Sequence, residues 1–247
     1  MPINPVIKQA QRAARRLTGR PASDPAGWRA QAALVDKQVT ARLMLPPASG
    51  VTVRDLSVPV PGQPPVRVRF YSPSQTRSRG CLLTFFGGAF RQGGLDFASV
   101  DRTNRARAIA ADVVVAAVDY ALAPEHRYPQ ALEQGLAALA YLDSASCPDG
   151  IDRQRLGVAG ASSGANLAAA VALANRDRGG PTLRLQLLEV PALDLTGGHL
   201  SRAVAWRLGA PPFLVARGLR SVVRDYLGDP ELARQPYASP LLAESLA

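Results

Sequence analysis

Cysteine, histidine and lysine are scarce in this sequence of 247 residues, and each shortage narrows what the protein can be. The two cysteines, Cys81 and Cys147, cannot build a disulfide framework. Cys81 begins an apolar run, so we expect its thiol to be buried. The two histidines, His126 and His199, are the only residues that offer a neutral imidazole as a general base. The sequence implies neither a metal site nor an organic cofactor.

Long hydrophobic runs are also missing. Residues 1–20 lack the continuous apolar segment of a signal peptide, and no stretch reaches the length of a membrane span. The chain is therefore expected to be soluble and cytoplasmic. Residues 3–20 can form a short amphipathic helix, for which we consider two roles, attachment to a membrane surface and packing against the protein body.

Positive charge is abundant, with a formal net value of +10, but arginine supplies almost all of it because Lys8 and Lys37 are the only lysines. The arginines are scattered, apart from a local cluster within residues 12–20. Nucleic-acid-binding proteins usually concentrate their charge on one face or motif. No zinc-ligand pattern, RNP-type aromatic motif or basic heptad array accompanies the charge here. Nucleic acid is therefore not an expected partner.

The spacing of apolar residues predicts an α/β protein. A helix is predicted from Pro25 to Leu45, followed by two alternating strands at 51–58 and 66–71 with a turn at 61–65. Strands that alternate with helices imply a mostly parallel sheet with helices on both faces. No repeat or low-complexity linker interrupts the pattern, so a single domain is expected. The buried strands are predicted at 81–86, 113–118, 156–159 and 183–190, and the helices between and after them at 100–111, 130–143 and 165–174.

The segment Arg155–Asn175 combines a short apolar run, the string G-A-S-S-G at 160–164 and an alanine-rich helix. A serine on a tight strand-to-helix turn is held in a strained conformation, and small neighbours let the chain turn that sharply. Its hydroxyl then projects at a helix N-terminus, which favours a developing negative charge. Ser162 is therefore the candidate nucleophile. In a chain rich in alanine and glycine, the same string also fits an ordinary turn.

The glycine-rich segment 87–94 follows the first predicted buried strand. Small residues let backbone N–H groups turn inward, where they can hold the oxyanion of a tetrahedral intermediate in acyl transfer. Two other interpretations are an ordinary turn between a strand and a helix, and a phosphate-binding loop. The phosphate interpretation has no support from G-x-x-x-x-G-K-[ST] or G-x-G-x-x-G, because neither occurs.

Taken together, four motifs give the chain a resemblance to the hormone-sensitive-lipase-like group of α/β-hydrolase serine esterases. The segment 86–90 (F-G-G-A-F) resembles the family's H-G-G-G-F/W loop, and 160–167 (G-A-S-S-G-A-N-L) resembles G-D-S-A-G-G-N-L. The segment 119–129 resembles D-Y-R-L-A-P-E-H-x-F-P, and 238–243 resembles S-P-L-x-A. The motifs keep the family's order and spacing, and the likeness runs from about residue 30 to the last residue.

The resemblance implies a three-layer α/β-hydrolase sandwich with a mostly parallel central sheet, formed by one domain over residues 1–247. It places the sheet core at 51–200 and a helical cap at 1–50 and about 201–235. By the same resemblance Ser162 is the nucleophile of a serine carboxylesterase that acts on short acyl esters, which are small-molecule substrates. The oxyanion hole would be formed by the backbone N–H groups of Gly87, Gly88 and Ser163.

Among the departures from the family motifs, four bear on the loop and on the residue before the nucleophile or alter a motif charge. Phe86 replaces the loop histidine and Ala89 its third glycine, while Ala121 and Ala161 replace the arginine and the aspartate of two other motifs. The methyl group of Ala89 restricts the loop backbone, which bears on the geometry of the oxyanion hole.

The family's triad aspartate and histidine, with its last two strands, come after the S-P-L-x-A motif, and this chain stops at Ala247. The resemblance therefore implies a C-terminal truncation. His126 lies in a motif where the family histidine is structural. Asp194 and His199 could substitute as acid and base, or Asp194 could cap its loop and leave His199 exposed.

Three expectations follow from the missing residues. Esterase activity should be weak or absent, because a serine hydroxyl is a poor nucleophile without a base. The alternative function is a non-catalytic α/β-hydrolase-like binding or interaction module. The strand at 183–190 should become the edge of the sheet, where self-association can occur.

Overall fold

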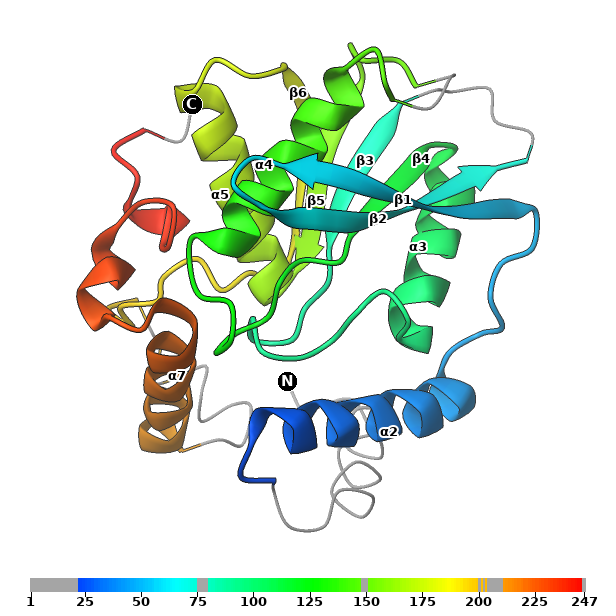
Figure 1. Cartoon of the computed structure of the whole chain (residues 1–247). Coiled ribbons are helices and arrows are strands. Elements are labelled where there is room, and N and C mark those ends of the chain that lie inside the picture. Colours follow the sequence, from blue (N-terminus) through cyan, green and yellow to red (C-terminus); the bar gives the residue numbers. More distant parts are fainter. Residues whose placement is uncertain are drawn as a thin grey trace.

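The computed structural model describes residues 22–74, 80–147, 151–199, 201, 203 and 211–245 (Figure 1). The amphipathic helix predicted at 3–20 lies outside the described residues. In the part of the chain that is described, no helix is both long enough and apolar enough to cross a membrane.

The described residues form one sheet of six strands in the order β1-β2-β4-β3-β5-β6. The first two pairs, β1 with β2 and β2 with β4, are antiparallel, and the remaining three are parallel. The predicted combination of an antiparallel pair with a parallel sheet is confirmed. The strands are β1 (Val51–Val60), β2 (Gln63–Pro73), β3 (Cys81–Phe85), β4 (Val114–Val118), β5 (Leu156–Ala161) and β6 (Leu183–Glu189).

The turn between β1 and β2 is shorter than predicted. It consists of Pro61 and Gly62, whereas Pro64 and Pro65, expected in the turn, belong to β2. Proline cannot donate a ladder hydrogen bond and is tolerated where no partner needs that N–H. The pairing of β2 with β4 begins only at Val68, so the two prolines precede it, and β1 and β2 shift register nearby.

Three of the five α-helices of the described chain pack against the sheet, and the other two lie beyond one end of it (Figure 1). The helix predicted at 130–143 has those bounds, and those predicted at 25–45, 100–111 and 165–174 differ by two or three residues at their ends. The last helix lies within the segment 201–235, for which the sequence predicts cap helices without bounds. The five helices are α2 (Pro25–Leu43), α3 (Ala98–Ala111), α4 (Gln130–Asp143), α5 (Ser163–Asp177) and α7 (Pro212–Leu227), followed by the 3₁₀ turns η1 (Pro230–Arg234) and η2 (Pro240–Leu242).

Two neighbouring residues of β3 show that helices cover both faces of the sheet. Thr84 Oγ1 lies 3.4 Å from Asn104 Oδ1 of α3, whereas the ring of Phe85 lies against Gly135 of α4. Because successive side chains of a strand point to opposite faces, α3 and α4 lie on opposite faces. Helix α5 packs beside α4. The three-layer arrangement predicted from the sequence is therefore confirmed.

Helix α2 ends at Leu43, two residues earlier than predicted. A guanidinium nitrogen of Arg102, on α3, donates hydrogen bonds to the carbonyl oxygens of Thr40, Met44 and Leu45 at 2.9, 3.2 and 3.3 Å. Met44 is extended, so the carbonyls at and after the helix end turn toward Arg102. A tertiary contact thus fixes the end of this helix, ahead of the two prolines that follow.

The sheet has an uncovered edge at β6, as the sequence predicted. In the described residues β6 pairs only with β5, and Leu185 and Leu187 remain 54% and 39% exposed. By contrast, every residue of β3 and β4 is buried. The thiol of Cys81, at the start of β3, is buried as expected, and burial raises its pKa.

Candidate active site

Ser162 occupies the turn between β5 and α5 with φ 55° and ψ −116°. Positive φ is unfavourable for a residue with a side chain and costs on the order of 1–3 kcal/mol. Backbone hydrogen bonds hold the turn in place: Ser162 N–H donates to Glu189 O at 2.9 Å, and Ser162 O accepts from Ala165 and Asn166 at 3.1 Å. The strand, tight turn and helix predicted for this segment are confirmed.

The two glycines of the G-x-S-x-G string are required by close approach. A Cβ atom on Gly160 would lie 2.2 Å from Gly164 O, and one on Gly164 would lie 2.2 Å from Phe85 O. Both distances are far inside van der Waals contact with backbone atoms. Side chains at these positions would therefore push α5 away from β5 and β3 and change the turn that carries Ser162.

The loop after β3 lies directly against this turn. A Cβ atom on Gly87 would lie 3.4 Å from Ser162 Cβ and 2.8 Å from Ala161 O. The next amide, Gly88 N–H, donates a hydrogen bond to Ser163 Oγ at 3.1 Å. The structure thus brings the three predicted oxyanion residues, Gly87, Gly88 and Ser163, together beside Ser162. Their role as donors to an oxyanion stays a prediction.

The loop backbone is strained after the two glycines. Ala89 and Phe90 both have positive φ, at 54° and 61°. A left-handed conformation costs about 1–2 kcal/mol for each residue that carries a Cβ. Phe90 is held there by a stacking contact with Tyr226, with ring centroids 3.8 Å apart. At position 89 the family motif has a glycine, which adopts this conformation without the penalty.

Phe86 fills the position of the motif histidine by packing on an aromatic ring. Its ring stacks on that of Tyr120 at 4.2 Å between centroids. The hydroxyl of Tyr120 donates to Phe86 O at 2.7 Å. Burial raises the pKa of Tyr120, so the hydroxyl remains a donor at neutral pH. Tyr120 therefore fixes the first residue of the glycine loop.

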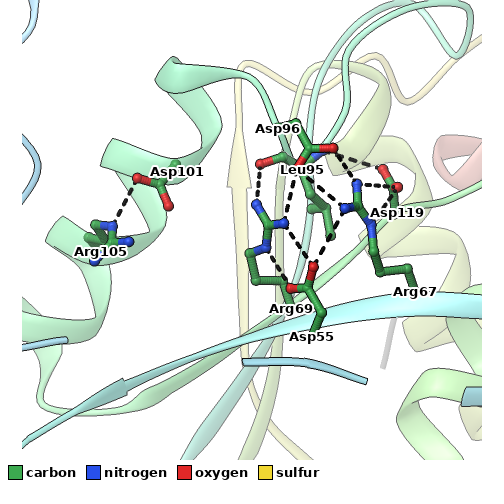
Figure 2. Close-up of polar contacts among 8 residues, drawn as sticks. All are labelled: Asp55, Arg67, Arg69, Leu95, Asp96, Asp101, Arg105 and Asp119. Atoms are coloured by element: carbon green, nitrogen blue, oxygen red, sulfur yellow. Dashed lines mark hydrogen bonds and ion pairs between the residues drawn. The ribbon is translucent and has the colours of Figure 1, made fainter. Parts of the chain in front are cut away.

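The other end of the loop is held by a group that we call the arginine–aspartate cluster, namely Asp55, Arg67, Arg69, Asp96 and Asp119 (Figure 2). Arg67 contacts Asp96 at 2.7 Å and Asp119 at 2.8 Å. Arg69 contacts Asp55 at 2.6 Å and Asp96 at 2.9 Å. The two arginines of β2 thereby hold Asp96, which belongs to the segment between β3 and α3, and link it to Asp55 of β1 and to Asp119 after β4.

The cluster also binds the loop backbone. Leu95 O accepts from Arg69 at 2.9 Å, and Leu95 N–H donates to Asp119 Oδ1 at 3.3 Å. The hydrogen bond from Arg69 lowers the pKa of Asp55, and that from Arg67 lowers the pKa of Asp96. Sequence reasoning missed this cluster. Its available signals were Asp119, which begins a quoted motif, and Asp55 opposite Arg69 in the register of β1 and β2.

The candidate acid and base lie in the loop after β6. His199 Nδ1 is 2.9 Å from Asp194 Oδ2, so the structure does bring this pair together. Asp194 also accepts from the backbone N–H groups of Thr196 and His199, at 2.8 and 2.9 Å. The His199 side chain is 62% exposed. The aspartate therefore caps its own loop, as the simpler of the two interpretations expected.

Neither histidine reaches the candidate nucleophile. Among the described residues no hydrogen bond joins Ser162 Oγ to another side chain, so the Asp194–His199 pair is not connected to it. His126 is exposed, with Nδ1 3.1 Å from Gln130 Oε1. In the same described part of the chain, no group of three or more His, Cys, Asp or Glu side chains could hold a metal ion.

A cavity of about 790 Å³ opens between α2 and the glycine loop. Helix α2 is held over the loop by Arg29, which donates to Arg91 O and Ala123 O at 3.0 and 3.1 Å and pairs with Glu125. Gly87, which faces Ser162, forms part of the cavity wall. The wall also includes Trp28, Ala32, Val35, Val39, Met44, Gly88, Phe97, Val100 and Ser221.

The family model described as "alpha/beta hydrolase fold" matches residues 82–247, which include Ser162 and the glycine loop. The chain belongs to this family. Among curated relatives, the esterase LipI of Mycobacterium tuberculosis is 36% identical over 199 residues, which are 79% of this chain and 60% of the relative. The carboxylic ester hydrolase LipN of the same organism is 37% identical over 208 residues, or 81% of this chain and 54% of that protein.

Solved structures of this α/β-hydrolase family agree with the fold. A hyperthermophilic esterase from the archaeon Pyrobaculum calidifontis superposes with a TM-score of 0.83 at 31% identity, over 99% of this chain and 76% of the other. The predicted fold class and the predicted resemblance are confirmed. The present chain spans 54–60% of the length of LipI and LipN.

The buried side-chain amide of Asn166 joins the motif around Ser162 to the motif near residue 240. Asn166 Nδ2 donates to Ala192 O at 2.8 Å and to Ala238 O at 2.9 Å. Ser239, also buried, accepts from Leu195 N–H at 2.9 Å. These two motif residues hold the segment after β6 beside the N-terminus of α5. The motifs identify both residues, but nothing in the sequence predicts these hydrogen bonds.

Proposed function

We propose that this chain carries the nucleophile and the oxyanion-binding loop of a serine carboxylesterase that acts on short acyl esters. The observation that carries the proposal is the position of Ser162. It lies in a turn with positive φ at the N-terminus of α5, and Gly87 of the glycine loop faces it so closely that a Cβ atom on Gly87 would lie 3.4 Å from Ser162 Cβ. The names of the relatives LipI and LipN support the same class of reaction.

In the proposed reaction Ser162 Oγ attacks the carbonyl carbon of the ester. A new C–O bond forms, and the carbonyl π electrons move onto oxygen to give a tetrahedral oxyanion. The Gly87 N–H and the N–H of Ser163, at the first position of α5, would donate to it. Collapse expels the alcohol, which takes up a proton, and leaves an acyl-enzyme that water hydrolyses.

Proton transfer limits this chemistry. The serine proton must pass to a base, and none of the described side chains is hydrogen-bonded to Ser162 Oγ. In serine proteases, loss of any triad member leaves only about 10³–10⁴-fold acceleration over the reaction in water. We therefore expect the 247-residue chain to hydrolyse esters weakly or not at all.

The cavity beside Gly87 supports the proposed substrate class. Its wall on the α2 side includes the apolar side chains of Trp28, Val35 and Val39 beside the polar ones of Gln31, Asp36 and Thr40. Such a wall suits an acyl chain, because burying apolar surface contributes about 25 cal/mol per Å². We propose that residues 1–50 and about 201–235 form the cap over this cavity, within one domain of residues 1–247.

The experiment compares wild type with Ser162→Ala, using a short p-nitrophenyl ester for turnover and an organophosphonate for covalent labelling. Slow labelling that disappears in Ser162→Ala is the expected result. Ser57→Ala, on the exposed side of β1, serves as the control for serine removal. Absence of any labelling would contradict the proposal and favour the alternative, a non-catalytic binding module.

Fast turnover that depends on Ser162 would contradict the expectation of weak activity, because it requires a base. The variants His199→Ala and His126→Ala would then identify it. A loss of turnover in His199→Ala and in Asp194→Asn, with none in His126→Ala, would assign the acid and base to the pair in the loop after β6.

A further inference from the structure

The side chain of Ser163 accepts a hydrogen bond from one of the loop N–H groups that are predicted to bind the oxyanion. Ser163 is the first residue of α5, and it is 1% exposed. Its Oγ accepts the N–H of Gly88 at 3.1 Å. A buried hydroxyl must find partners inside the protein. An amide N–H carries one hydrogen, so this contact takes up the donor of Gly88.

A second buried hydroxyl lies beside the first. Tyr120 is fully buried, its hydroxyl donates to Phe86 O at 2.7 Å, and a hydrogen bond with Ser163 opposes the effect of burial on its pKa. Ser163 therefore lies between Tyr120 and Gly88. The motif that the sequence resembles has an alanine at position 163, which could not accept the Gly88 N–H. The extra oxygen is a feature of this chain.

We propose that the Ser163 hydroxyl competes with the oxyanion for the Gly88 N–H and so acts as a positioning residue for the glycine loop. This inference rests on the proposed function. While the hydroxyl holds the amide, two of the three predicted donors are available, the N–H groups of Gly87 and Ser163. The third is released only when the contact between Gly88 and Ser163 breaks.

The geometry of the loop allows that release. Gly88 O is fixed by the N–H groups of Arg91 and Gln92, at 3.0 and 3.1 Å. The peptide plane that carries the Gly88 N–H lies between two glycines, where no Cβ atom restricts rotation. Gly87 N–H makes no hydrogen bond to any described residue. The competition is therefore local to one peptide plane, and it is controlled by one side chain.

The test removes the hydroxyl with Ser163→Ala. Hydrogen exchange at the Gly88 amide measures the contact itself and does not depend on activity. The rate at which an organophosphonate labels Ser162 measures the oxyanion hole. One donor to an oxyanion is worth about 10²–10³ in rate, which sets the upper limit of the gain. We expect exchange at Gly88 and labelling of Ser162 to rise at least about 10-fold.

Ser144→Ala is the matched control. Ser144 is half-buried and its Oγ accepts a backbone N–H, from Ser146 at 3.2 Å, but the hydrogen bonds of its hydroxyl stay within residues 141–146 at the end of α4. It should leave exchange at Gly88 and labelling of Ser162 unchanged. Ser163→Thr keeps the hydroxyl and should keep Gly88 protected. If the threonine variant does not fold, Ser163→Gly gives a second removal and should match Ser163→Ala.

The outcomes separate this inference from the proposed function. Unchanged exchange at Gly88 in Ser163→Ala overturns the inference, and so does faster exchange with equal or slower labelling. If turnover is measurable, kcat should rise while KM stays constant, because the gain is confined to the transition state. Absence of labelling in both proteins overturns the proposed function, and this inference with it.

Discussion

Arg67 Nη2 lies 2.7 Å from Asp96 Oδ2 and joins strand β2 to the segment that follows the glycine loop. The contact belongs to the arginine–aspartate cluster, in which Arg69 also holds the carbonyl of Leu95 (Figure 2). Tyr120 holds the loop at the other end through Phe86 O. The loop that carries Gly87 and Gly88 is thus fixed at both ends by side chains far away in sequence.

The first prediction concerns Arg69, whose side chain is 15% exposed. Arg69→Met removes the hydrogen bond to Leu95 O and those to the carboxylates of Asp55 and Asp96, which then keep only their contacts with Arg67. We expect a loss of about 2 kcal/mol in the free energy of unfolding, measured by urea denaturation. Amide exchange in residues 87–97 should rise at the same time.

Arg105 offers the comparison, because it pairs with Asp101 at 2.8 Å within helix α3. Pairs of this i,i+4 kind contribute about 0.3–0.5 kcal/mol, so Arg105→Met should cost less and leave exchange in the glycine loop unchanged. Equal losses of stability in the two variants, with equal exchange, would show that the cluster is not specifically holding the loop.

The second prediction concerns Ala89, which has φ 54°. Ala89→Gly removes a steric penalty of about 1–2 kcal/mol, while the unfolded chain gains about 0.4–1 kcal/mol of conformational freedom. A net stabilisation of about 0.5–1 kcal/mol is expected from thermal or urea unfolding. Ala243→Gly is the control, since Ala243 has φ −65° and gains nothing. A destabilised Ala89→Gly would mean that the strain is not present.

The third prediction concerns Asp194, whose side chain is 7% exposed. Burial alone would raise its pKa, but hydrogen bonds from the Thr196 hydroxyl and from His199 outweigh it and lower the pKa to about 2. The pKa of an aspartate in an unfolded chain is about 3.9. Because the folded pKa is the lower one, the stabilisation is complete above about pH 4 and is lost as the pH falls toward 2.

Asp194→Asn should remove this pH dependence. Between pH 5 and pH 2, wild type should lose about 2 kcal/mol more of its unfolding free energy than the variant does. Thr196→Ala, which takes away a donor, should fall between them. Urea denaturation at a series of pH values measures the difference. A constant gap between wild type and Asp194→Asn across that range would contradict the assignment.

The fourth prediction concerns the edge strand β6, where Leu185 and Leu187 remain exposed. An uncovered strand presents unpaired N–H and C=O groups, so a second copy of the chain can pair with it. We expect self-association at high concentration in sedimentation velocity, and a decrease in Leu185→Lys. Leu214→Lys is the control, because Leu214 is 50% exposed on α7 and away from the strand. An equal effect of both variants would exclude the edge as the contact.

The sequence by itself determined the alternation of strands and helices and the turn at Ser162. The elements depend on the spacing of apolar residues along the chain. The turn depends on glycines that let backbone segments pack closely, such as Gly160 and Gly164. Both signals can be read from the sequence. It also predicted which strand would be left at the edge of the sheet. The motifs alone predicted that Gly87 and Ser162 belong to the same site.

The tertiary structure alone decided how the loop and the helix ends are held. Arg69 and Leu95 are 26 residues apart, and Arg102 reaches Met44 across 58 residues, so no local pattern could have paired them. The Ser163 hydroxyl was equally hidden: the motif identifies the residue, but only the folded chain places Gly88 N–H 3.1 Å away. The spacing of apolar residues determines which residues form a helix or strand. The partner of a charged or polar side chain depends instead on which elements the fold brings together.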